Sequence, residues 1–165
     1  MGARANFVII RNGIAEAYYD HWAALGCLLL FAEGPEKALQ ALEITDKTNE
    51  LMERAWAEGG YLVDFDHHTA IVFGYQDITG LSEEDFIKMG KDEADKSRAV
   101  HSAFEKGPLN YLKYIAPHWK GWLLLWDNRG VDRFSEYLQQ RNISTIRWQP
   151  ASSPPSQLKL AEYQA

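Results

Sequence analysis

The dipeptide Asn12-Gly13 constrains the fold of this chain more than any other local feature. It follows the segment Ala5 to Arg11, which is rich in Val and Ile, and precedes Ile14 to His21, so both segments are predicted strands. Asn-Gly supports the positive φ angles of a two-residue hairpin turn. The chain is therefore predicted to open with a β-hairpin. Because a doubly wound parallel sheet needs strands that alternate with helices, this hairpin excludes a Rossmann-like fold.

Helical spacing and turn residues predict the remaining elements. The predicted helices cover residues 36–44, 47–57, 82–106, 109–115 and 131–140, and the further predicted strands cover residues 61–66, 69–75 and 119–126. Ser82 is a suitable N-cap for the segment 82–106, which is polar for its length and is interpreted as an inserted helix. Two hairpins and one further strand predict an α+β fold, with a mostly antiparallel sheet of about five strands and helices mainly on one face.

A single domain is expected for a chain of 165 residues of which 46% are hydrophobic. We place this domain at residues 1–143. The run Ser152-Ser153-Pro154-Pro155-Ser156 lacks apolar side chains, so residues 144–165 are interpreted as a partly ordered C-terminal tail. Removal of residues 152–165 is accordingly expected to cost little stability.

Negative charge is concentrated in one stretch of the chain. Residues 33–66 contain nine acidic and three basic side chains, and their net charge of -6 equals that of the whole chain. An acidic patch accelerates association with a basic protein partner. The candidate partner-binding residues are Glu36, Glu43, Asp46, Glu50 and Glu53, which we expect on the predicted helices with Tyr or Trp side chains nearby as anchors. An ordinary solvated helical face is the alternative interpretation of the same residues.

Composition also excludes several classes of partner. Nucleic acid requires a concentrated basic surface, which this acidic chain lacks, so DNA and RNA are not expected partners. The longest apolar run, Leu28 to Ala32, is far shorter than the roughly 18 residues of a membrane span, so no membrane partner is expected. The N-terminus has no apolar secretory signal, and the single cysteine, Cys27, has no partner for an internal disulfide. We therefore expect a cytoplasmic protein.

The segment Asp64-Phe65-Asp66-His67-His68 combines residue types that bind metals. Strand alternation would place Asp64, Asp66 and His68 on one face, an arrangement that a small metal-dependent hydrolase could use. The same five residues separate two apolar runs, where Asp favours a tight turn. We favour the turn, so no metal and no cofactor is expected, and the hydrolase is the alternative.

Cys27, paired with a histidine, is the other candidate for catalysis. Leucines surround it in the sequence, as is typical of a buried cysteine in a core. The chain contains no Gly-x-Ser-x-Gly motif, and Gly59-Gly60 precedes a predicted strand rather than a helix that could bind phosphate. No catalytic residue is therefore assigned, and an enzyme is not the favoured interpretation.

Aromatic residues suggest both core and surface roles. The apolar run from Trp119 to Trp126 would be apolar on both faces of a strand, which favours a covered, central strand over an exposed aromatic surface. The segment Tyr18-Tyr19-Asp20-His21-Trp22 is interpreted either as core plus edge or as part of a pocket.

Five segments together resemble a family of small, uncharacterised bacterial proteins that is common in actinobacteria. These segments are Arg4 to Ile10, Tyr18 to Trp22, Gly34-Pro35-Glu36, Trp56 to Gly60 and Gly121 to Trp126. The resemblance covers most of the chain outside residues 82–106 and the tail, and it implies no catalytic residue. In that family the turn after the Asp-x-Asp pair is rich in arginine, so His67-His68 departs from the pattern.

The chain is also similar in size, acidity and lack of catalytic motifs to the immunity proteins that neutralise secreted bacterial toxins. This likeness implies a cytoplasmic protein-binding module that occludes the active site of a cognate toxin. A regulatory or structural subunit without a toxin partner is a further alternative.

Overall fold

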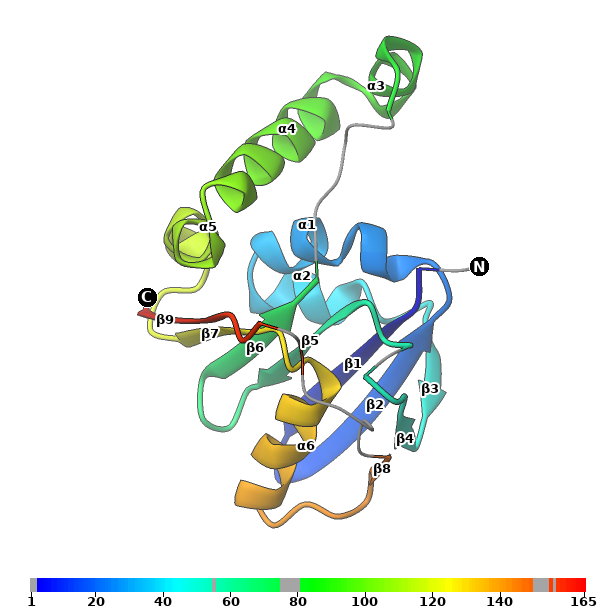
Figure 1. Ribbon diagram of the computed structural model, residues 1–165, viewed down its shortest axis with the longest axis vertical. Helices are drawn as coiled ribbons and strands as arrows, with labels where there is room; N and C mark the ends of the chain where they lie inside the picture. Colours follow the sequence, from blue (N-terminus) through cyan, green and yellow to red (C-terminus); the bar gives the residue numbers. More distant parts are fainter. Residues whose placement is uncertain (1–2, 55, 75–80, 150–154, 156) are drawn as a thin grey trace.

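A computed structural model describes residues 3–54, 56–74, 81–149, 155 and 157–165 of the chain. Its centre is a seven-stranded sheet with the order β3-β2-β1-β5-β6-β7-β9 (Figure 1). The strands are β1 (Ala5–Arg11), β2 (Ile14–Asp20), β3 (Asp46–Thr48), β5 (Gly59–Asp64), β6 (Thr69–Phe73), β7 (Leu123–Asp127) and β9 (Leu160–Gln164). Two short strands, β4 (Glu50–Leu51) and β8 (Arg147–Trp148), pair in parallel as a separate small sheet.

The predicted opening hairpin is confirmed. β1 and β2 pair in antiparallel fashion from Ala5 opposite Asp20 to Arg11 opposite Ile14. Asn12 and Gly13 have φ angles of 54° and 75°, which is the left-handed geometry of a tight hairpin turn. Two residues are enough to specify this turn because its geometry is local.

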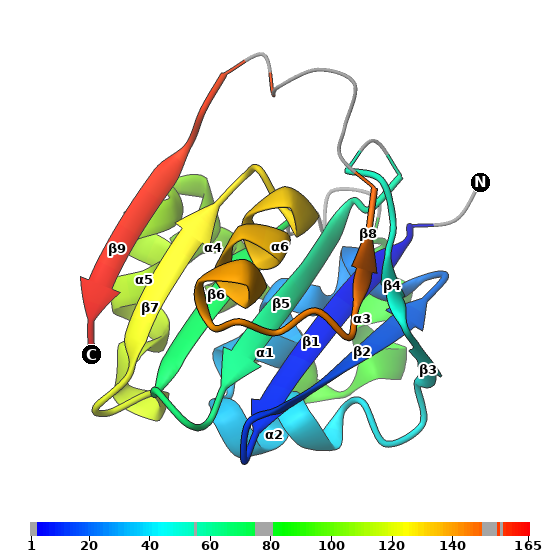
Figure 2. The ribbon, with the colours of Figure 1, turned by 90° about the horizontal axis from the view of Figure 1, so that it is seen from below.

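The helices are α1 (Cys27–Ala32), α2 (Pro35–Gln40), α3 (Glu83–Met89), α4 (Lys91–Glu105), α5 (Pro108–Ile115) and α6 (Val131–Gln140), with short 3-10 turns η1 (Ala23–Leu25) and η2 (Ala116–His118). In Figures 1 and 2, α1, α2, α4 and α5 lie over one face of the sheet, and α6 lies over the other. Within the described residues, none of these helices is both long enough and apolar enough to cross a bilayer.

Each face of the sheet has its own core, because alternate residues of a strand point to opposite faces. The larger core joins Phe7, Tyr61 and Trp126 to α1 and α5. The second joins Val8, Leu62 and their neighbours to α6, β4 and β8. The α+β class is therefore confirmed. α1, α2, α4 and α5 cover one face of the sheet, and α6 covers the other face.

The expected sheet matches the observed sheet in part. Four of its neighbouring strand pairs are antiparallel, but β1 pairs with β5 and β6 pairs with β7 in parallel. The sheet is mixed and has seven strands rather than about five. Parallel pairing joins strands that are distant in sequence, so hairpin signals alone could not predict it.

The predicted helix at residues 47–57 is wrong. Asp46–Thr48 forms the edge strand β3 against β2, and Glu50–Leu51 forms β4 against β8. The buried side chain of Asn6 accepts a hydrogen bond from the backbone nitrogen of Met52 at 2.7 Å. This contact holds the segment in an extended path beside β1, and helical spacing of its apolar residues could not reveal it.

The C-terminal segment 144–165 contributes to both sheets. β8 pairs with β4, and β9 pairs with β7 over its whole length. Ala161, Tyr163 and Ala165 pack against the larger core. The expectation that residues 152–165 add little to the fold is therefore revised for the part that forms β9. The covered position predicted for the Trp122 to Trp126 strand agrees with this pairing, since β7 lies between β6 and β9.

Residues 83–105 form two helices rather than one. Gly90, with a φ of 93°, separates α3 from α4. Ser82 caps α3 as predicted, and its hydroxyl accepts a hydrogen bond from the backbone nitrogen of Asp85 at 3.1 Å. α3 has no buried residue, whereas α4 buries Ala94, Ser97, Val100 and Ala103. The interpretation of residues 82–106 as an inserted segment stays a prediction.

Candidate protein-binding surface

The five candidate acidic residues lie on different elements. Glu36 is on α2, Asp46 is on the edge strand β3, and Glu50 is on β4. Glu43 lies in the turn between α2 and β3, and Glu53 lies after β4. Four of the five are exposed, and Glu53 is half-buried. The prediction that they share acidic helices is wrong for all but Glu36. Residues 46–48 and 50–51 form strands, α2 ends before Glu43, and Glu53 lies beyond β4.

A groove of about 390 Å³ brings two of the five acids together. It lies where β2, β3 and β4 meet, and it is lined by Asn6, Tyr19, Asp46, Lys47, Thr48, Glu50 and Met52. Glu36, Glu43 and Glu53 do not line it. The structure therefore divides the acidic segment into an acidic groove, defined by these seven residues, and three acids outside it.

Charge in the acidic groove stays negative despite Lys47. The Lys47 ammonium lies 2.6 Å from the carboxylate of Glu16, on the neighbouring strand β2, and this hydrogen bond lowers the pKa of Glu16. Lys47 is thus already paired. Glu50 has a loose, exposed partner in Arg147 at 3.6 Å, and no ion pair involves Asp46 within the part of the chain that is described. The Asp46 carboxylate is therefore available to pair with a cationic group of a partner.

The floor of the acidic groove is rigid. Asn6 is fully buried, its amide nitrogen donates to the backbone oxygen of Tyr18 at 3.1 Å, and its amide oxygen accepts from the nitrogen of Met52. One side chain thereby joins β1, β2 and the segment after β4. A surface held in this way loses little conformational entropy when a partner binds.

Three ring side chains, Tyr19, His21 and Trp22, lie next to one another where β2 ends, beginning at the acidic groove. The Tyr19 hydroxyl lies 3.0 Å from Nδ1 of His21, and the His21 ring meets the Trp22 ring edge-on at 4.8 Å between centroids. Trp22 is 63% exposed. Of the two interpretations of this segment, Tyr18 fits the core and Tyr19 fits a pocket, since Tyr18 is buried and Tyr19 lines the groove.

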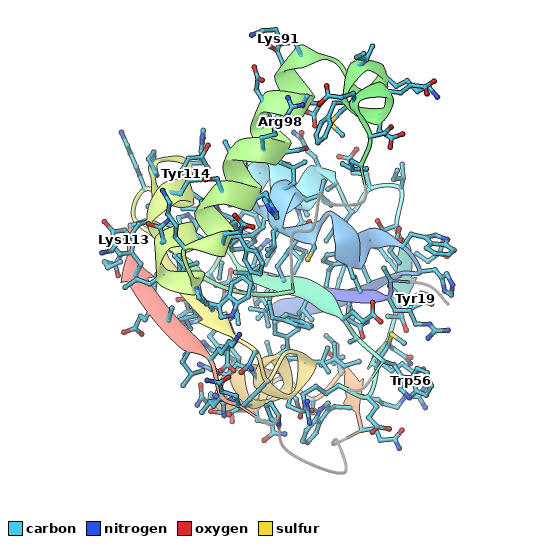
Figure 3. The ribbon with its side chains drawn as sticks, turned by 45° about the horizontal axis from the view of Figure 1, so that its top comes forward. Tyr19, Trp56, Lys91, Arg98, Lys113 and Tyr114 are labelled. Atoms are coloured by element: carbon cyan, nitrogen blue, oxygen red, sulfur yellow. The ribbon has the colours of Figure 1, made fainter. Side chains whose placement is uncertain are left out.

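Trp56 is a second exposed aromatic residue in this region. It is 53% exposed, and the guanidinium carbon of Arg4 lies 5.5 Å from the centre of its ring. Figure 3 shows Tyr19 and Trp56 on the same side of the molecule, away from Lys113 and Tyr114. Trp56 belongs to the segment 47–57, for which a helix was wrongly predicted, so helical spacing could not indicate its exposure.

The predicted turn at Asp64 to His68 is confirmed, and it employs both carboxylates. Oδ1 of Asp64 accepts hydrogen bonds from the backbone nitrogens of Asp66 and His67 at 2.9 and 3.2 Å. The carboxylate of Asp66 reaches the first hairpin, where it accepts from the nitrogens of Asn12 and Gly13 at 2.7 and 2.8 Å. These two hydrogen bonds lower the pKa of Asp66. The segment therefore joins two turns of the sheet.

The second oxygen of Asp64 is also engaged. It accepts from the Tyr137 hydroxyl at 2.5 Å and lies 2.9 Å from Nδ1 of His67 and 3.7 Å from Nε of Arg141. Burial, followed by this hydrogen bond, raises the pKa of Tyr137 to about 12. His68 does not join the cluster, because its ring stacks on Trp122 at 5.0 Å. Among the described residues, no group of three or more His, Cys, Asp or Glu side chains is placed to hold a metal ion.

Cys27 occupies the core position that was predicted for it. It is fully buried, and its sulfur lies 3.4 Å from the backbone oxygen of Ala24 and 3.5 Å from that of Phe73. Burial raises the pKa of the Cys27 thiol to about 12. A thiol in this environment is protonated near neutral pH and is a poor nucleophile.

Comparison with known proteins found no matching family model, no matching curated protein and no matching solved structure. The resemblance to the actinobacterial family and the likeness to immunity proteins stay predictions.

Proposed function

We propose that the protein is a protein-binding module that takes up a basic partner at the acidic groove, as an immunity protein does when it blocks a bacterial toxin. The observation that carries the proposal is the placement of Asp46 and Glu50 beside Tyr19, with Trp22 exposed at the end of the same strand. Tyr and Trp are the residue types that most often dominate binding energy, and acids around them speed encounter with a cationic surface.

The two groups of residues have different roles in this proposal. The acids are exposed, so they act at a distance and raise the association rate. The aromatic side chains act after contact, because their burial against the partner slows dissociation. Inhibition of this kind needs a rigid, complementary surface rather than a reactive group, and Asn6 provides that rigidity.

The metal-dependent hydrolase has less support. Each carboxylate oxygen of Asp64 and Asp66 already accepts a hydrogen bond from the protein. A metal at this turn would compete with the hydrogen bonds by which Asp66 joins the two hairpins. Asp64 is also fully buried, which restricts the approach of a substrate.

The proposal is tested with the protein encoded beside this one, co-expressed in a host whose growth that protein stops. Growth rescue and equilibrium affinity are measured for wild type, for the double variant Asp46→Lys with Glu50→Lys, and for Trp22→Ala. The matched controls are Glu83→Lys with Asp92→Lys, which makes the same charge change on α3 and α4, and Tyr114→Ala, which removes an exposed aromatic from α5.

We expect the double variant Asp46→Lys with Glu50→Lys and the variant Trp22→Ala each to weaken binding at least about tenfold, since single hot-spot truncations commonly cost about 2 kcal/mol. The controls should bind like wild type. Equal affinity of these two variants and the controls would refute the assigned surface. Failure of the wild type to bind or to rescue growth would refute the immunity role.

A further inference from the structure

We propose that the cavity between α1, α4 and α5 binds a small organic acid that carries an apolar chain or ring. This helix cavity has a volume of about 440 Å³, which is within the range of small-molecule sites. It is lined by Leu29, Ala32, Glu33, Lys37, Lys96, Val100, Tyr114, Ile115 and His118. It lies on the opposite face of the sheet from α6 and shares no residue with the acidic groove.

The inner wall of the helix cavity suits an apolar group. Ala32, Val100 and Ile115 come from three different helices and are almost completely buried. Leu29 adds a fourth apolar side chain from α1. Transfer of an alkyl chain from water onto such a wall is favourable in proportion to the apolar area that is covered.

The mouth of the helix cavity is cationic. Lys96 on α4 lies 2.6 Å from the carboxylate of Glu33, so those two charges compensate one another. Lys37 on α2 is exposed, and no ion pair involves it in the described part of the chain. His118 adds a second potential hydrogen-bond donor. Lys37 is therefore a cation without a protein counterion at the edge of an apolar cavity.

The surrounding sequence reinforces this charge. Residues 106–120, which include α5 and η2 and the residues on either side of them, contain Lys106, Lys113 and Lys120 and no acidic residue, although the whole chain carries a net charge of -6. A basic stretch in an acidic protein raises the local concentration of anions. An apolar wall below a basic mouth matches an amphipathic anion rather than a neutral or cationic ligand.

The walls of the helix cavity are held in place by buried hydrogen bonds. The Tyr111 hydroxyl donates to the backbone oxygen of Leu28 at 2.6 Å, and Nε1 of Trp119 donates to that of Phe31 at 3.0 Å. Both bonds fix α5 and η2 against α1. Gly34 allows the closest approach, because a Cβ there would lie 2.7 Å from the backbone oxygen of His118. The cavity is thus preformed and not opened by a ligand.

Hexanoate is a suitable probe, and hexanol is its neutral counterpart of equal chain length. Both are titrated into the full-length protein, with amide chemical shifts as the readout. We expect hexanoate to shift amides of α1, α4 and α5 saturably, with a dissociation constant of about 1 mM. Hexanol should bind about tenfold more weakly. No protein partner is used, so this result is independent of the proposed function.

The variant Lys37→Met removes the uncompensated cation, and Lys113→Met is its control. Lys113 precedes Tyr114 on α5 (Figure 3), is exposed and does not line the cavity. Hexanoate should bind Lys37→Met about tenfold more weakly, and Lys113→Met no more than about twofold more weakly, because Lys113 does not line the cavity and acts only through the surrounding field. Both positions are exposed, so both variants should fold. The inference fails if hexanoate gives no saturable shift, if hexanol binds equally well, or if the two variants behave alike.

Discussion

Replacement of Asp64 by alanine should destabilise the protein by about 3 kcal/mol, as expected when one partner of a buried, hydrogen-bonded charge is removed. Its carboxylate is fully buried and accepts from two backbone nitrogens and from the Tyr137 hydroxyl. Alanine leaves all three donors without this acceptor and leaves Arg141 without its buried counterion. The loss stays near the lower end of the expected range because His67 and Arg141 are partly exposed and can bind water.

Urea unfolding followed by tryptophan fluorescence measures this loss directly. For a chain of this size, about 3 kcal/mol corresponds to a melting temperature that is lower by roughly 6–12 °C. Asp64→Asn should lose about half as much, because an amide oxygen can still accept from the backbone. The control Glu43→Ala removes an exposed acid and should change stability by less than about 0.5 kcal/mol.

The contrary result is equally clear. If Asp64→Ala and Asp64→Asn both cost less than about 1 kcal/mol, the carboxylate does not hold the turn of residues 64–68 and α6 together. The hydrolase alternative would then regain support, because a buried acid that is dispensable for folding is available for chemistry.

Three further predictions concern other parts of the fold. A chain that ends at residue 156 lacks β9, and its free energy of unfolding should be about 2–4 kcal/mol lower in the same assay, because the apolar contacts of Ala161 and Tyr163 are removed. A loss below about 1 kcal/mol would show that the tail is dispensable for folding. Asp66→Asn should lower the melting temperature near pH 7, and the difference from wild type should shrink as the pH falls below about 4, because a lowered pKa in the folded state stabilises only while the carboxylate is charged. A difference that is the same at both pH values would contradict the hydrogen bonds from Asn12 and Gly13. Cys27 should react with a thiol reagent only when the protein unfolds, since it is buried and its pKa is raised; rapid reaction of the native protein would show that the thiol is accessible.

Features that depend on neighbouring residues were predictable from the sequence, and features that depend on distant pairing were not. Asn12-Gly13 specifies its turn locally, and the Asp64 to His68 turn follows from Asp between two apolar runs. The segment 47–57 has apolar residues from Leu51 to Trp56 at a spacing that also suits a helix, but the pairing of residues 46–51 with β2 and β8 overrides that preference. β9 pairs with β7, which lies more than 30 residues earlier in the chain. The short alternating segment that follows the Ser/Pro run therefore does not by itself predict a strand.

The candidate surface shows the same division. The excess of acidic residues in 33–66 identifies the acidic segment, and aromatic anchors near it are expected from the sequence. Which acids meet an aromatic residue depends on β3 pairing with β2, which brings Asp46 opposite Tyr19. Glu36 and Glu43 belong to the same stretch of sequence but lie outside the acidic groove, because the chain turns away through α2.

The association rate of the protein with its neighbouring gene product, measured over a range of salt concentrations, tests the central claim most directly. Steering by the acidic groove predicts that Asp46→Lys with Glu50→Lys slows association about tenfold at low salt and flattens its salt dependence. Glu83→Lys with Asp92→Lys should leave both quantities near wild type. Equal association rates and equal salt dependence for the two double variants would contradict the claim that the acidic groove receives the partner.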